Sequence, residues 1–465
     1  MSARTVTSAG VDAPAGPPTL GEAFRVWLTI GVMSFGGPAG QIALMHRMLV
    51  EERRWLDESR FLHALNYCML LPGPEAQQLA TYVGWLMHRT LGGLIAGILF
   101  VLPGALVMLA LSAAYALYAE LPLVVAAFAG VKAAVLIVVV EAVLRIGKRA
   151  LKTPPMYLLA ALAFAAIFLF DVPFPLIIAA AALAGFAGGR LWPGQFIVIA
   201  PAKAGGADGA SVVDRMAAAG GLDHTRPRAA RSLLLIVVFA ALWGGPAFGL
   251  MAVLGPEHVL SQTAAFFSKL AVVTFGGAYA VLAYMAQQAV ESYQWLTGPE
   301  MLDGLGLAET TPGPLILVTQ FVGFLASFRN PGPLDPLAAG ALGAALTIWV
   351  TFAPCFLWIF LGAPYIERLR DNRLLSAALS AITAAVVGVI LNLAAWFGLR
   401  VVFAEVGEAR FGPLQLPAPD WASLDPLALG LTVVAAVAML ALHQGVLRTL
   451  ALCAGLAMAA HFAFG

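Results

Sequence analysis

Long apolar segments separated by short polar stretches run through most of this chain. In the first part they cover 24–49, 61–87, 91–118, 122–145, 155–170 and 173–190, and in the second part 263–288, 301–328, 336–363, 374–402, 424–441 and 446–464. A helix needs about 20 apolar residues to cross a bilayer. Several segments reach that length, whereas 155–170 and 173–190 are short. The strict apolar and polar alternation of a membrane β-barrel is missing, so the pattern predicts transmembrane helices.

One long polar stretch divides the chain. Residues 191–230 are Gly-rich and basic, and a lone apolar segment, 231–253, follows them. The first residues are rich in Ala, Gly, Pro and Ser and lack the apolar core of a signal peptide. We therefore expect a disordered tail at 1–20, an N-terminal transporter repeat at 21–190, a cytoplasmic loop at 191–230, a linker transmembrane helix at 231–253 and a C-terminal repeat at 254–465.

The two parts share motifs at matched positions. SFGGPAGQ (34–41) precedes LPGP (71–74) by the same distance as TFGGAYAV (274–281) precedes TPGP (311–314). Trp55 and Trp295 keep this register. Later, Pro103 and Pro354 share a longer separation with KAAV (132–135) and TAAV (383–386), because a loop of the second part is extended. Two consistent registers indicate an internal duplication.

Basic residues are distributed oppositely in the two repeats. Loop 46–60 contains four arginines, whereas its counterpart 289–303 contains no Lys or Arg. Loop 364–373 is basic, whereas its counterpart 113–122 is not. Cytoplasmic loops carry the excess of Lys and Arg, so the two repeats are predicted to have opposite membrane orientations, with the linker helix supplying the odd crossing. Re-entrant hairpins at the two motifs are favoured over full spans, because they keep 46–60 cytoplasmic.

Composition supports this membrane assignment. The chain of 465 residues is 61% hydrophobic and 11% charged, whereas soluble domains carry about 25% charged residues. Its net charge of +1 gives no reason to expect nucleic acid. Cys68, Cys355 and Cys453 are scattered, which argues against disulfides and a cysteine metal site. No HExxH, GxSxG or nucleotide-binding loop is present, so an enzyme is disfavoured; neither a cofactor nor a metal is expected.

The Gly-Gly and Pro-Gly-Pro stretches predict interrupted helices. Proline removes a backbone donor and breaks a helix, and a helix that restarts exposes free N–H groups that suit an anion. Such breaks are tolerated at membrane depth only beside protein or water; ordinary packing kinks are the alternative. The predicted substrate-binding residues are Gly36, Gly37, Gln41, Pro72, Gly73, Pro74, Gln77, Gln78, Lys132, Gly276, Gly277, Thr310, Thr311, Pro312, Gly313, Pro314 and Gln320.

Three charged residues stand out in apolar segments. Glu75 follows one Pro-Gly-Pro, and Glu309 precedes the other. Intramembrane carboxyl groups are costly and usually functional, so we expect proton coupling at one or both; carboxyl groups satisfied by backbone donors are the alternative. Lys132 is expected to pair with the substrate or with Glu141, and snorkelling is the alternative.

These motifs resemble the chromate ion transporter family in its long, two-domain form. The resemblance rests on SFGGPAGQIALMHRMLVEERRWLDE, LLPGPEAQQLATYVGW, TFGGAYAVLAYM and GLAETTPGPLILVTQFVGF, and it covers roughly residues 20–402. It implies an inner-membrane exporter of chromate that is driven by the proton motive force and confers resistance, with the FGG and PGP segments, Glu75 and Glu309 as functional positions. The residues alone indicate only a transporter, and they favour an anion as its substrate.

We therefore expect an all-α polytopic membrane protein with two inverted-topology repeats, broken or re-entrant helices and a linker helix. Its expected partners are chromate or a similar oxyanion, protons and the lipid bilayer, with a homodimer left open. The N-terminus is expected to be cytoplasmic and the C-terminus periplasmic. Transport of sulfate, molybdate or an organic acid in either direction remains the main alternative, and a scaffold subunit is a further one.

Overall fold

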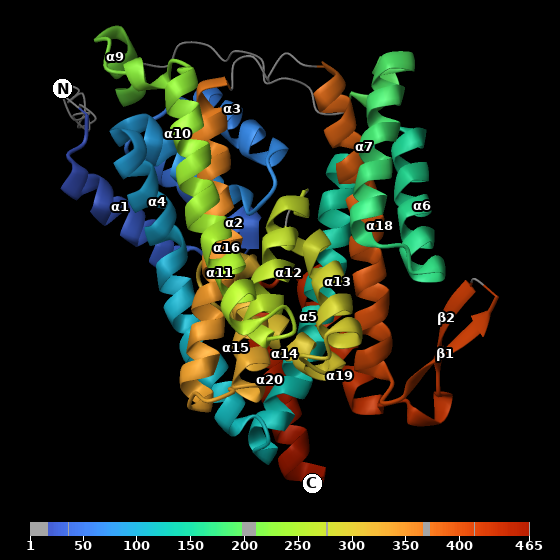
Figure 1. Cartoon of the computed structure of the whole chain (residues 1–465). Coiled ribbons are helices and arrows are strands. Elements are labelled where there is room, and N and C mark those ends of the chain that lie inside the picture. Colours follow the sequence, from blue (N-terminus) through green and yellow to red (C-terminus); the bar gives the residue numbers. More distant parts are fainter. Residues whose placement is uncertain are drawn as a thin grey trace, which may run out of the picture.

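The computed structural model describes residues 17–35, 37–197, 211–275, 278–365, 373–412 and 414–464. Almost every element is helical (Figure 1). Seven of the described helices are long and apolar enough to cross a membrane, and the chain is an all-α polytopic membrane protein. Figure 1 places the start of α1 and the end of α20 towards opposite ends of the helix bundle, which we name the N side and the C side.

The first part of the chain begins with short helices around the predicted breaks. These are α1 (Leu20–Met33), α2 (Gly37–His46), the π-helix η1 (Arg47–Glu52) and α3 (Glu58–Leu70). The longer helices that follow are α4 (Glu75–Tyr118), α5 (Pro122–Ala150), α6 (Pro154–Phe170) and α7 (Phe174–Leu191). The α4 helix has non-helical dihedral angles at His88 and Arg89. Gly84 and Gly92 lie in contact across this point, so α4 consists of two helices folded against each other.

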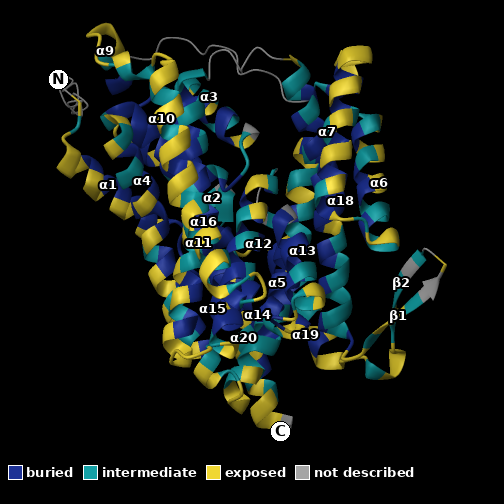
Figure 2. Cartoon of the chain, viewed as in Figure 1, coloured by how far each residue is buried: buried dark blue, intermediate teal, exposed yellow. Residues whose placement is uncertain are grey.

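The stretch between the two parts of the chain contains short helices and one span. The short elements are α8 (Pro193–Phe196), α9 (Val212–Ala218) and η2 (Asp223–Thr225). The predicted linker helix follows as α10 (Ala229–Phe239), η3 (Ala240–Gly244) and α11 (Gly245–Leu254). These three form one continuous apolar span at 229–254, in which Phe239 alone is buried. Figure 2 shows its exposed outer face, as expected of a helix in contact with lipid.

The second part repeats the order of the first. Its short elements are α12 (Val259–Val273), α13 (Ala278–Gln287), the π-helix η4 (Gln288–Ser292), α14 (Gly298–Thr310), η5 (Leu315–Leu317) and α15 (Val318–Arg329). The longer helices are α16 (Pro336–Gly362), continued by η6 (Ala363–Tyr365), and α18 (Arg373–Val402). The chain ends with α19 (Pro426–Ala436), η8 (Val437–Ala441) and α20 (Val446–Phe464).

One element was not expected from the sequence. The strands β1 (Val406–Phe411) and β2 (Leu414–Pro419) pair antiparallel after α18, with Val406 opposite Pro419, and η7 (Trp421–Ser423) follows them. This hairpin lies beside the bundle on its C-side half (Figure 1). It is short and lacks a clear apolar alternation, so hydropathy alone gave no signal for it.

The two parts share local backbone geometry. Arg54 and Gln294 occupy matched positions and both have positive φ, at 50° and 53°. The amides of Trp55 and Trp295 each donate 2.8 Å hydrogen bonds to the residue six positions earlier. Asp57 caps α3 and Thr297 caps α14, in each case through the side chain. Such matched detail fits the internal duplication inferred from the motifs.

The two parts are interleaved rather than separate. The α5 helix packs against α19 and α20, whereas α18 packs against α6 and α7. The α5 and α18 helices also pack against each other, as do α4 and α16. Figure 2 shows the buried residues concentrated where these helices meet. A single hydrophobic cluster extends over most of this interior.

Candidate functional site

The predicted breaks are real interruptions between helices. The α1 helix ends at Met33 and α2 starts at Gly37, whose φ is +67°. The α3 and α14 helices end at Leu70 and Thr310, immediately before the Pro-Gly-Pro stretches. Both central glycines of these stretches have left-handed φ values, +119° at Gly73 and +87° at Gly313, which favour glycine over other residues. Gly36, Gly276 and Gly277 lie outside the described residues.

The breaks of the two parts meet through a reciprocal pair of hydrogen bonds. The amide of Gly73 donates to the carbonyl of Thr274 at 2.8 Å, and the amide of Gly313 donates to the carbonyl of Ser34 at 2.8 Å. Ser34 and Thr274 are repeat counterparts, as are Gly73 and Gly313. Each Pro-Gly-Pro is therefore bonded to the Phe-Gly-Gly break of the other part. We name this arrangement the crossing.

The crossing changes the expectation about free amide donors. The amides of Gly73 and Gly313 were expected to be open to an anion, but here they are bonded to carbonyl groups. Their proline neighbours Pro72, Pro74, Pro312 and Pro314 have no N–H to offer. The open donors at the crossing are therefore the first-turn amides of the helices that restart there, since the first four N–H groups of a helix lack intrahelical partners.

Each Pro-Gly-Pro also packs against a long helix of the other part. A Cβ atom placed on Gly104 of α4 would lie 2.0 Å from the carbonyl oxygen of Pro312. At the matched place, Cys355 of α16 lies against Gly73. Pro103 and Pro354 precede these two positions inside their helices. The crossing is thus enclosed by α4 and α16.

Buried glutamines surround the crossing. Gln41 donates from Nε2 to the carbonyl of Gly313 at 2.6 Å, and Gln78 donates to that of Pro72 at 2.7 Å. Gln77 donates to Thr81 at 3.0 Å, and Gln320 of α15 to Ala105 at 2.9 Å. The side-chain oxygen of each of these four glutamines has no hydrogen-bond partner. Buried orphaned polar atoms indicate a place for water or a ligand, and each amide nitrogen carries a second N–H.

The hydroxyl groups of the two predicted threonines form hydrogen bonds within α14. Thr310 donates its hydroxyl proton to Leu307, and Thr311 donates to Ala308. Both acceptors are carbonyl groups of α14 itself. These hydroxyl groups therefore close the end of α14, and their donors are not directed at the crossing.

The two predicted coupling carboxyl groups lie at opposite helix ends. Glu75 is the first residue of α4, where the helix dipole favours a negative charge. Glu309 is buried near the last turn of α14, where the dipole disfavours one. The hydroxyl of Tyr279 donates to Oε1 of Glu309 at 2.8 Å, and its oxygen lies 4.0 Å from where a Cβ atom on Gly37 would be. Tyr279 therefore connects Glu309 with the start of α2.

Lys132 forms an ion pair that the sequence did not predict. Its Nζ lies 3.3 Å from Oδ1 of the buried Asp303 on α14. The hydroxyl of Tyr115 on α4 donates to the other carboxyl oxygen of Asp303 at 2.7 Å. Glu141 pairs instead with Arg145, one turn along α5. The expectation of a Lys132–Glu141 pair was wrong, because α14 brings a carboxylate closer than the next turns of α5 do.

Sequence reasoning missed Asp303, Tyr115 and Tyr279. Asp303 could have been found, because it is a carboxyl group inside the apolar segment 301–328 and such groups need a partner. The two tyrosines gave no such signal, since aromatic residues are common in apolar segments. Their roles depend on which helices pack together.

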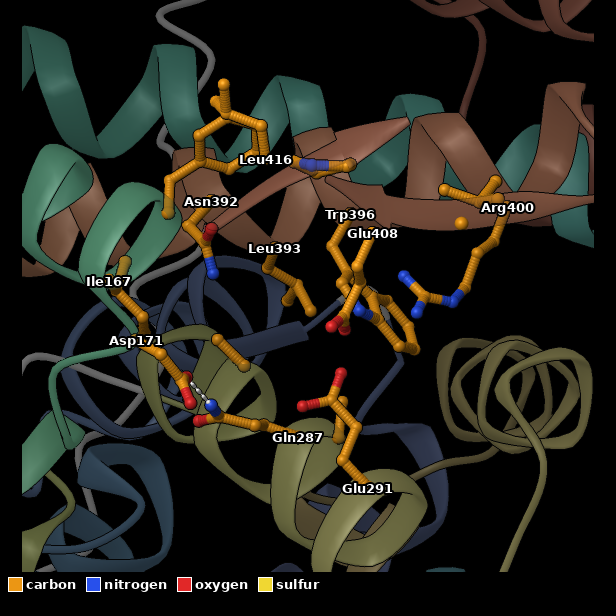
Figure 3. A pocket seen from close by; sticks show the side chains of 16 residues that line it. Ile167, Asp171, Gln287, Glu291, Asn392, Leu393, Trp396, Arg400, Glu408 and Leu416 are labelled. Atoms are coloured by element: carbon orange, nitrogen blue, oxygen red, sulfur yellow. Dashed lines mark hydrogen bonds between the residues drawn. The ribbon is translucent and has the colours of Figure 1, made fainter. Parts of the chain in front are cut away.

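A cavity of about 290 Å³ opens beside these elements. Its walls are the end of α6, the outer turns of α13 and η4, the C-side half of α18, and β1–β2. Figure 3 shows Gln287, Glu291, Trp396, Arg400 and Glu408 around it. The side chain of Gln287 donates to Asp171 at the tip of the α6–α7 hairpin. The cavity thus lies between elements of both parts.

Comparisons with known proteins agree with the motifs. The model of the chromate transporter family matches residues 21–186 and 261–460. A chromate transport protein of Pseudomonas aeruginosa is 33% identical over 417 residues, covering 87% of this chain and 88% of the relative. A chromate transport protein of Cupriavidus metallidurans is 29% identical, covering 83% and 84%. No solved structure matches the chain. The chain therefore belongs to the chromate transporter family.

Proposed function

We propose that this protein is an inner-membrane secondary transporter that exports chromate from the cytoplasm in exchange for protons and thereby confers chromate resistance. Relatives that cover most of the chain are named as chromate transport proteins. The observation that carries the proposal is the crossing, in which Gly73 and Gly313 each bond to the other part. Many secondary transporters bind their substrate where interrupted helices meet between two repeats, and the crossing is a place of this kind.

The two repeats are proposed to have opposite membrane orientations. Segment 54–55 bonds to α9, and His88 bonds to Pro18, so the turns of the first repeat gather at the N side. Arg329 donates to the carbonyl of Trp295, and these turns of the second repeat lie towards the C side (Figure 1). With the basic loop 46–60 cytoplasmic, the N-terminus is inside and the C-terminus outside. Exchange of conformation between the repeats then gives alternating access.

The oxyanion is proposed to bind at the crossing. The first turn of α2 offers the backbone amides of Gly37, Ala39 and Gly40 and the positive end of a helix dipole. Gln41 follows in the second turn. Gln77 and Gln320 each retain an amide N–H beyond the one already bonded, and Gln78 follows Gln77 in the first turn of α4. Amide groups and a helix dipole bind a dianion without a fully charged cation beside it, so the dianion can also be released. Gly36, Gly276 and Gly277 are proposed to belong to the same site.

Glu309 is proposed as the main proton carrier, with Glu75 in a supporting role. A buried carboxyl group at the C-terminal end of a helix is stabilised by protonation. A proton on Glu309 would also remove a charge that repels the dianion. The inside-negative potential already favours export by about 2.3 kcal/mol per charge per 100 mV. Proton entry adds the pH gradient to this driving force.

Inside-out membrane vesicles that contain the protein test this proposal. With an acidic, positive lumen, they are expected to accumulate radiolabelled chromate, and a protonophore is expected to abolish the accumulation. Glu309→Gln is expected to lose proton-driven accumulation, with vesicles that lack the protein as the control. Accumulation no greater than in that control would contradict the proposed export. Equal accumulation of sulfate, or its equal competition, would show that the substrate is a wider class of oxyanion.

A further inference from the structure

The cavity beside α13 extends along this helix towards Glu309. Ala283, Gln287 and Glu291 line it from the α13–η4 side. Residues three or four apart share one face of a helix, and Tyr279 lies four positions before Ala283 on that face. One turn of helix is about 5.4 Å. The inner end of the cavity therefore lies about one turn from the tyrosine that donates to Glu309.

The wall of the cavity formed by α18 also runs inward, from the C side towards the interior. Asn392, Trp396 and Arg400 line the cavity from α18 and are spaced four residues apart. Arg400 is the nearest of the three to the C-side end of α18, and Asn392 is the deepest. Figure 3 shows these side chains facing those of α13 and η4. The α13 and α18 helices pack against each other, so the two walls converge inward.

The lining of the cavity is acidic. Asp171, Glu291 and Glu408 contribute carboxyl groups, and among the described residues that line it Arg400 alone is basic. The guanidinium of Arg400 stacks on Trp396, 3.9 Å from the ring centroid. A cleft lined by one sign of charge concentrates ions of the other sign. This lining attracts cations and repels a divalent anion.

We propose that this cavity is the C-side proton path to Glu309, and that its acidic lining excludes the oxyanion. The proposal deepens the proposed function and rests on it. Protons would pass from the carboxyl groups at the mouth along the shared face of α13 to Tyr279 and Glu309. The other charged groups acting on Glu309 are Arg145 and Glu141 of α5, which pair with each other. The anion and the proton would thus use different routes to the crossing.

Cysteine labelling in the full-length protein tests the path. Asn392→Cys places a thiol at the inner wall of the cavity, and Leu391→Cys places one on an exposed apolar position of the same helix. A cationic methanethiosulfonate is expected to react with Asn392→Cys about tenfold faster than an anionic one. Adding Glu291→Gln and Glu408→Gln should bring the two rates together. Leu391→Cys, facing lipid, should show no such preference, and the buried native cysteines give the background.

Leu416→Cys on the β-hairpin wall offers a second labelling position if Asn392→Cys does not fold. In vesicles, labelled Asn392→Cys is expected to retain chromate binding and to lose chromate-dependent proton movement. Equal rates for the two reagents, no reaction at either position, or normal proton movement after labelling would each overturn this inference alone. No chromate-dependent proton movement in the unlabelled wild-type protein would overturn the proposed function, and this inference with it.

Discussion

The cluster of Lys132, Asp303 and Tyr115 illustrates how a residue's role depends on its partner. In the sequence, Lys132 is a cation inside an apolar segment, and such a cation suggests an anionic substrate. In the structure it joins the two parts of the chain through the buried carboxylate of Asp303. One carboxylate oxygen of Asp303 accepts a hydrogen bond from Tyr115, and the other lies 3.3 Å from Nζ of Lys132 in an ion pair, without a hydrogen bond of its own. This geometry gives Lys132 a structural role in the state described.

Removing one member of this ion pair should be costly. Lys132→Met is expected to destabilise the protein by about 3–5 kcal/mol, because a carboxylate is left buried without its cation. The double variant Lys132→Met with Asp303→Asn should recover much of that loss. Thermal unfolding of the purified protein measures both. If the double variant is stable but no longer binds chromate, the structural role is insufficient and Lys132 belongs to the substrate site after all.

At the scale of elements, the predicted cytoplasmic loop contains an ordered brace. Val212 and Val213 of α9 donate backbone hydrogen bonds of 3.0 and 3.1 Å to Arg54 and Trp55. Asp214 pairs with Arg60 at 2.8 Å. Further along, His224 bonds to the carbonyl of Trp85 at 3.0 Å. The brace therefore holds the N-side turns of the first repeat in place.

The brace should weaken as the pH falls. Burial, opposed by the hydrogen bond to Trp85 and assisted by Arg89 and Arg231, lowers the pKa of His224 below its ordinary value of 6.5. Below about pH 6.5, His224 is therefore protonated in the unfolded chain but remains neutral in the folded brace. Protonation then favours the unfolded state, so the folding stability of the brace falls as the pH falls below about 6.5. Hydrogen exchange of α9 and η2 between pH 7.5 and pH 5.5 measures the effect.

Asp214 should add to the loss only at lower pH. Burial alone would raise the pKa of Asp214, but hydrogen bonds from Ser211 and the charge of Arg60 lower it below 3.8. Its stabilising contribution is therefore lost only in strongly acidic solution. His224→Gln is the matched control, because it retains a donor to Trp85 without a titratable ring. Unchanged pH dependence of exchange in His224→Gln would show that another group is responsible.

The sequence predicted these elements unevenly. The breaks at Ser34–Gly37 and Leu71–Pro74 follow from Gly and Pro, whose backbone effects are local, and the linker span follows from hydropathy. The non-helical point at His88–Arg89 falls at the predicted boundary between the apolar segments 61–87 and 91–118, but hydropathy gave no sign that the two helices fold back against each other there. The β-hairpin was missed for a similar reason. Local chemistry predicts where a helix stops, but not what the end contacts.

At the scale of the whole molecule, the two parts meet in a way that no single segment encodes. The duplication was visible from matched motifs, and the matched turns at Arg54 and Gln294 are consistent with it. The bonds from Gly73 to Thr274 and from Gly313 to Ser34 could not be predicted, because they depend on how the parts dock. The same docking occupies the glycine amides that were expected to be free. It leaves the first turn of α2 and the glutamines as donors.

The position of bound chromate tests this arrangement most directly. Chromium scatters anomalously, so diffraction from crystals grown with chromate locates the metal atom of the oxyanion. We predict a chromium peak between Gly73 and Gly313, within hydrogen-bonding reach of the first turn of α2 and of Gln41. A peak in the acidic cavity beside Arg400, or on one repeat away from both Pro-Gly-Pro stretches, would contradict binding at the crossing.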